Sequence, residues 1–110
     1  MKTSYTKTAR ITESASICTG SGFLFSILVG TDNTNDPVVA AYDDTDATTA
    51  ANRIIPSVTY DASVLGLNGV VMQFPKKFTT GLYIAIANIG SGEVVIDYRQ
   101  ENDLFPYKFI

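Results

Sequence analysis

Short runs of β-type residues, separated by turn residues, recur along the whole chain and limit what it can fold into. The longest apolar run extends only from Phe23 to Val29 and is interrupted by Ser26. Clusters of glycine, proline, asparagine and aspartate bound the runs, as in 19–22, 30–37 and 90–92. No helical heptad and no internal repeat is visible, so the pattern predicts an all-β domain.

The runs predict about seven to eight short strands. They cover 3–17, 23–29, 38–42, 53–60, 70–74, 81–89 and 93–99. Strands of this length and spacing bury their apolar sides between two sheets, so we expect an antiparallel two-sheet sandwich, jelly-roll or Ig-like. The strand order is left open. Asn68-Gly69 is typical of a tight hairpin turn. The strand after this turn, 70–74, is expected to end at Pro75.

The alternation of side chains along these runs predicts the core. We expect 23–29 to be a central strand buried on both faces, whereas 81–89 and 93–99 alternate between an inward and an outward side. Most of the core is expected from Phe23, Phe25, Ile27, Val29, Val39, Ile55, Val58, Leu67, Val70, Met72, Leu82, Ile84, Ile86, Val94 and Ile96.

The 110 residues suffice for one domain of ordinary size. We divide the chain into an extended N-terminal arm or edge strand (1–16), a β-sandwich domain (17–99) and a C-terminal apolar tail (100–110). The apolar side chains of the tail need cover from water. Two arrangements stay open: a last strand on its own sandwich, or an arm docked on a neighbouring subunit. The candidate partner-contact residues are Leu104, Phe105, Tyr107, Phe109 and Ile110.

The residue types that most catalytic sites need are absent or isolated. The chain has no histidine, and its one cysteine, Cys18, forms no intrachain disulfide. No Ser-His or Cys-His pair is therefore available, and Cys18 is interpreted as a small buried apolar residue. The Gly-Ser-Gly turns at 20–22 and 90–92 lack the lysine of a phosphate-binding loop. We expect a protein that is not an enzyme and binds no cofactor.

Two acidic loops have the composition of a calcium site but not its spacing. Asp32 and Asp36 lie in one loop, and Asp43 and Asp46 in the next. Calcium prefers carboxylate and amide oxygens on such loops. Neither loop has the glycine and the glutamate that an EF-hand requires. Because aspartate and asparagine are also the residues that turns prefer, we predict turn chemistry and no metal.

Charge and hydropathy exclude two classes of partner. The formal net charge is −3 and the sequence pI is about 4.6, so no positive field gathers nucleic acid, and Lys76-Lys77 is interpreted as a solvated connector. No apolar run approaches the roughly 20 residues of a membrane helix, so we expect no membrane partner. No apolar signal region follows the basic N-terminal residues, so synthesis in a cytoplasm is expected.

A resemblance adds to this interpretation. The stretches 25–32, 35–37, 54–56, 60–63 and 67–69, followed by the strands at 81–84 and 93–99, resemble a recurrent pattern in small virion proteins of tailed bacteriophages. The similar region covers about residues 22–99. The resemblance implies a non-enzymatic β-sandwich on the virion, and it brings no catalytic residue with it.

Two functions follow as hypotheses. The first is a capsid decoration (cement) protein that binds and stabilises the phage head. The second is a tail- or fibre-associated module that binds a host surface or a partner protein. In either case the expected partners are phage capsid or tail proteins and copies of the chain itself, because a homo-oligomer repeats its contacts on a symmetric particle.

Overall fold

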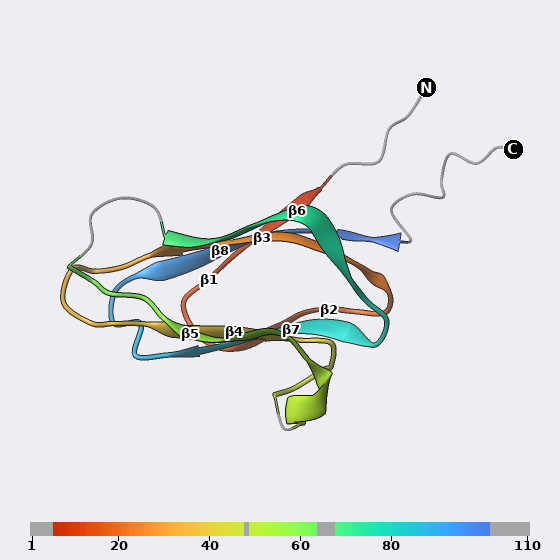
Figure 1. The fold of residues 1–110 in the computed structure, drawn as a ribbon, viewed down its shortest axis with the longest axis horizontal. Coiled ribbons are helices and arrows are strands. Elements are labelled where there is room, and N and C mark those ends of the chain that lie inside the picture. The colour runs from red at the N-terminus through yellow and green to blue at the C-terminus, as the bar shows by residue number, and fades with distance from the viewer. Residues whose placement is uncertain (1–5, 48, 64–67, 102–110) are drawn as a thin grey trace, which may run out of the picture.

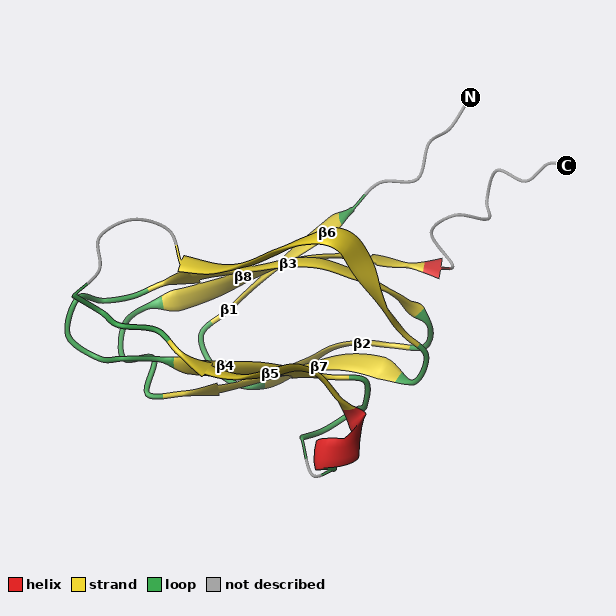
Figure 2. Ribbon diagram, in the orientation of Figure 1, coloured by secondary structure: helices red, strands yellow, loops and turns green. Residues whose placement is uncertain are grey.

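Eight strands form two layers in the computed structural model, which describes residues 6–47, 49–63 and 68–101 (Figures 1 and 2). The predicted all-β antiparallel sandwich is confirmed. A 3₁₀ helix, η1 (Ala50–Asn52), precedes β5. The strands are β1 (Lys7–Ile11), β2 (Ala15–Thr19), β3 (Gly22–Gly30), β4 (Val38–Tyr42), β5 (Arg53–Thr59), β6 (Asn68–Phe78), β7 (Gly81–Ala87) and β8 (Glu93–Gln100).

The strand order, which the sequence left open, is that of a jelly roll. Sheet A has the order β1-β8-β3-β6 and sheet B the order β2-β7-β4-β5. All neighbouring strands are antiparallel. Apart from the connection from β4 to β5, each connection passes from one sheet to the other, which places the first strand beside the last. The edge strands are therefore β1 and β6 in sheet A, and β2 and β5 in sheet B.

The core fills the space between the sheets and draws on almost every strand. Along β7 and β8 the predicted alternation is confirmed, because Leu82, Ile84, Val94 and Ile96 are fully buried. Such alternation is what a strand with one solvent-facing side requires. The full core comprises Leu24, Ile27, Val29, Val39, Ala41, Ile55, Phe78, Leu82, Ile84, Val94, Ile96 and Tyr98.

An irregularity in β3 corrects the prediction for this strand. The register shifts between Leu24 and Ser26 against both neighbouring strands, so Phe25 has no paired residue of its own. Leu24 before the shift is fully buried, as are Ile27 and Val29 after it. Phe23 and Phe25, expected in the core, are only half-buried on the outer face. The extra residue of a β-bulge exchanges the two faces of a strand, which explains the difference.

The structure also corrects the expectations for 68–78. Asn68-Gly69 begins β6 and forms no hairpin turn, although Gly69 keeps a positive φ of 139°. A Cβ at Gly69 would lie 2.0 Å from the Ile27 carbonyl oxygen, so glycine is needed for this close approach. Pro75 does not end the strand. It is tolerated because β6 is an edge strand with one side unpaired. Lys76 and Lys77, expected in a connector, pair with β3.

The predicted core differs from the observed core at several further positions. Val58, Val70, Met72 and Ile86 are only partly buried, and Leu67 lies outside the described residues. Tyr98, expected to face inward along 93–99, is buried, as is Leu24 within the strand expected to be buried on both faces, whereas Phe78 was not predicted and is buried.

The stretch from Thr3 to Ile17, expected as one arm or edge strand, contains β1 and most of β2, which lie at the edges of different sheets. Cys18 is half-buried and packs against the core. Of the helical residues described, none belongs to a helix that could cross a membrane.

The bulge predicts losses of stability of different size for two neighbouring substitutions in β3. Leu24→Ala removes a fully buried side chain and should cost about 2–5 kcal/mol of unfolding free energy. Phe25→Ala removes a larger side chain from the outer face and should cost about 1 kcal/mol. Urea unfolding followed by circular dichroism measures both values. A larger loss for Phe25→Ala than for Leu24→Ala would contradict the assigned register.

Candidate functional site

Asp32 joins two loops at one end of the sandwich. The backbone N–H groups of Thr34 and Asn35 donate to Oδ1 over 2.9 and 2.8 Å. The Asn35 side-chain amide and the Ser91 backbone N–H donate to Oδ2 over 2.8 and 3.0 Å. These bonds, above all those from the Asn35 and Ser91 backbones, hold the pKa of Asp32 far below its usual range. The loop after β3 is thereby tied to the turn before β8.

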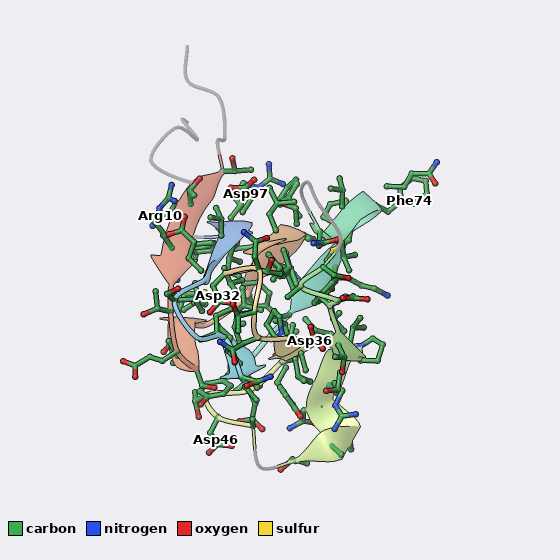
Figure 3. All side chains as sticks on the ribbon, turned by 90° about the vertical axis from the view of Figure 1, so that its left-hand side faces the viewer. Arg10, Asp32, Asp36, Asp46, Phe74 and Asp97 are labelled. Carbon is green, nitrogen blue, oxygen red and sulfur yellow. The ribbon has the colours of Figure 1, made fainter. Side chains whose placement is uncertain are left out.

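Asp36 and Asp43 make further ties between loops. Asp36 accepts the backbone N–H of Ala62 over 2.8 Å, and Figure 3 shows it at the same end of the molecule as Asp32. Asp43 follows β4 and accepts the backbone N–H groups of Thr79 and Thr80 over 3.0 and 2.8 Å. These carboxylates therefore fix the connections between strands.

Asp32 caps its own loop as the sequence predicted, whereas Asp43 accepts backbone N–H groups from a connection distant in sequence. N–H donors already occupy the carboxylate oxygens of Asp32 and Asp43. Asp46 is exposed and lies at the far side of its loop from the sandwich (Figure 3). In the ranges that the structure describes, no three His, Cys, Asp or Glu side chains converge in a way that could hold a metal ion.

Sheet B carries one shallow depression of about 140 Å³ on its outer face. Its polar groups are few: the Ser57 hydroxyl, and the Tyr42 hydroxyl, which already accepts a hydrogen bond from Arg53 Nε over 3.3 Å. Ligand pockets combine an apolar wall with several converging polar groups. This depression is lined mainly by small and apolar side chains, namely Val38, Ala40, Ala85, Ile86 and Ala87.

The outer face of sheet A carries an aromatic and cationic cluster. The guanidinium carbon of Arg99 lies 5.5 Å from the ring centroid of Phe23 and 5.3 Å from that of Phe25. Lys77 Nζ lies 4.9 Å from the Phe23 centroid and also pairs with Glu101. Cation–π contacts of this kind cover ring faces that would otherwise meet water. The two phenylalanines are therefore partly shielded, which fits their half-buried state.

Two uncovered apolar side chains lie on β6, the strand that also carries Lys77 of this cluster. Val71 and Phe74 are each 77% exposed, and they are the large apolar side chains that the described ranges leave in water. Val71 pairs with Ser26, and the Ser26 hydroxyl donates to the outward carboxylate of Asp97, so Val71 shares the outer face. Figure 3 labels Phe74 at the outer edge of the molecule, on β6. We call Val71 and Phe74 the β6 patch.

The sequence did not identify this patch. The run from Val70 to Phe74 has the composition of an ordinary buried strand. A weak signal was present in Pro75, which favours an edge strand. An edge strand leaves one side of its backbone open, and residues on such a strand are buried less readily.

The predicted partner-contact residues, Leu104, Phe105, Tyr107, Phe109 and Ile110, lie outside the described residues. The last residue that the structure describes is Glu101. The backbone N–H of Glu101 donates to the Ser21 carbonyl over 3.0 Å, and its carboxylate pairs with Lys77 of β6. Glu101 is thus held close to β3 and β6.

No family model matches the chain, and no curated protein or solved structure is similar to it.

The carboxylate of Asp32 predicts a defined dependence of stability on pH. Its pKa is lowered from 3.8 in the folded protein, so its contribution is present above that value and is lost as the pH falls below it. Asp32→Asn should therefore lower the melting temperature at pH 7 and reduce the loss of stability between about pH 5 and pH 2. Glu13→Gln, at an exposed carboxylate between β1 and β2, is the control. A variant whose pH profile matches the wild type would show that Asp32 is not the tie described.

Chelation should leave the folded protein unchanged. A metal bound selectively to the native state raises the melting temperature by mass action, so its removal would lower it. With the Asp32 and Asp43 oxygens occupied by N–H donors, we expect the same melting temperature with and without EDTA. Scanning fluorimetry measures it. A drop of several degrees that calcium restores would contradict the turn role of these loops.

Proposed function

We propose that the protein is a non-enzymatic virion structural protein of a tailed bacteriophage, and specifically a capsid decoration or cement protein that binds the phage head and stabilises it. The proposal starts from the order of strands and turns in residues 22–99, and the comparisons with known proteins add nothing to it. The jelly-roll order of the strands also fits, because viral capsid and lectin domains use this architecture. That support is an analogy at the level of the fold.

The observation that carries the proposal is the β6 patch. Free sheet edges with exposed apolar residues invite pairing with other chains, so soluble proteins usually shorten or cover them. Here an edge strand of 11 residues keeps both Val71 and Phe74 in water. A surface of this kind is suited to binding another protein.

Binding on a particle does not require a strong single contact. The patch is small, so one contact supplies modest affinity after ordering costs. A symmetric shell presents the same acceptor many times, and subunits linked to one another bind such an array with much higher avidity. Small size and a homo-oligomeric state therefore suit a decoration protein.

The alternative, a tail- or fibre-associated module that binds a host surface, would use a different part of the molecule. The depression on sheet B is the natural place for a small ligand, with Tyr42 and Ser57 at its margin. Glycan recognition needs several converging hydrogen-bond groups, and this lining offers few. We therefore favour decoration over host recognition.

Imaging of virions tests the function directly. Purified particles that carry the gene are analysed by mass spectrometry for the protein and its copy number, and by cryo-electron microscopy with a Fab fragment raised against it. We expect many copies spread over the head surface. A few copies at a single vertex or along the tail would favour the alternative, and absence from particles would overturn both.

A further inference from the structure

We propose that β6 binds the apolar segment 104–110 of a second copy of this chain by strand addition, with the β6 patch as its side-chain contact. The proposal rests on β6 and its neighbours and does not depend on the phage assignment. The acceptor strand is described by the structure, and the donor segment is defined by its sequence.

The acceptor is the most open edge of the sandwich. Among the strands that the structure describes, β6 pairs with β3 alone, so no described strand lies along the other side of its backbone. The edge strands β1, β2 and β5 have 5, 5 and 7 residues against 11 in β6. Both exposed large apolar side chains of the described ranges lie on β6. Strand addition uses these two features together, since backbone groups supply affinity and side-chain sites supply specificity.

The donor has the pattern that such an edge accepts. In an extended strand, alternate residues point to the same side, which would group Phe105, Tyr107 and Phe109. Such a segment would bring three aromatic rings to β6, the strand on which Val71 and Phe74 are exposed.

The distance from the end of β8 to the free side of β6 favours the segment of a second copy over the segment of the same chain. Glu101 lies at the end of β8, and the free side of β6 is about three strand spacings away, roughly 14 Å. Asn102 and Asp103 span at most about 7 Å when extended. Within one chain, the first apolar residues would be used to cross the end of the sheet. Only a segment from another copy can place all its apolar residues along β6.

An exchange of segments between two copies closes on itself. Each copy would donate its segment and receive the partner's, which gives a two-fold dimer with two identical contacts. Such a dimer leaves no β6 edge open for a third copy, so association stops at two.

Complementary variants of the full chain test the proposal. The β6 variant combines Val71→Thr with Phe74→Ser, and the segment variant combines Phe105→Ser, Tyr107→Ser and Phe109→Ser. Gln73→Ser, at an exposed polar residue of β6, is the matched control. Sedimentation equilibrium measures the dimer dissociation constant, and circular dichroism with thermal melting verifies that each variant is folded.

We expect the wild type and Gln73→Ser to dimerise equally, and each multiple variant to bind itself at least about tenfold more weakly. An equimolar mixture of the two variants should restore dimers, because one copy keeps an intact segment and the other an intact β6.

Three outcomes would overturn the proposal. A wild type that stays monomeric over the accessible concentrations would exclude exchange between copies. A segment variant that dimerises like the wild type would assign the contact to β6 alone. Variants that both lose association, but do not recover it when mixed, would place the segment and β6 in separate contacts. A dimer that behaves as expected but is absent from virions would refute only the phage assignment.

Discussion

The unpaired residue in β3 determines which side chains the rest of the structure buries or exposes. In sheet A, β3 lies between β6 and β8. Its register shifts against both neighbours, and both shifts fall at Phe25. Against β8 the shift leaves one residue of β3 without a partner, because Leu24 pairs with Tyr98 and Ser26 pairs with the adjacent Asp97. Against β6 the mismatch is larger, since Val71 and Lys76 pair with Ser26 and Leu24. The residues between them have no partners on β3, and Phe74 is among them.

The ends of the sandwich depend on a different interaction, the acceptance of backbone N–H groups by aspartate side chains. A jelly roll passes repeatedly from one sheet to the other, so its connections leave many backbone groups without ladder partners. Asp32, Asp36 and Asp43 each accept such groups from a connection distant in sequence. A carboxylate with several N–H donors is a charge-assisted acceptor and is stronger than a neutral one. These bonds give the carboxylates of the acidic loops a role in holding the fold together.

Local alternation allowed much of the fold to be predicted from the sequence, and its interruptions explain the errors. Val94 and Ile96 were placed correctly because β8 has a regular period of two residues. Phe25 was misplaced because nothing in the sequence marks a bulge, and the same residues continued without one would point inward. Gly69 has the backbone of a turn residue, yet it serves close packing against Ile27. Composition could suggest an apolar segment at 104–110, but not the acceptor, since Val71 resembles any strand residue.

An exposed edge as long as β6 is a hazard unless its pairing is limited. Pro75 removes one backbone donor, and Lys76 and Lys77 place charge at one end, two of the devices that blunt sheet edges. The irregularity opposite Leu24 and Ser26 also interrupts the flat surface that repeated stacking would need. These features leave Val71 and Phe74 exposed on β6 but discourage indefinite growth by repeated strand pairing, which is the behaviour expected of a binding site.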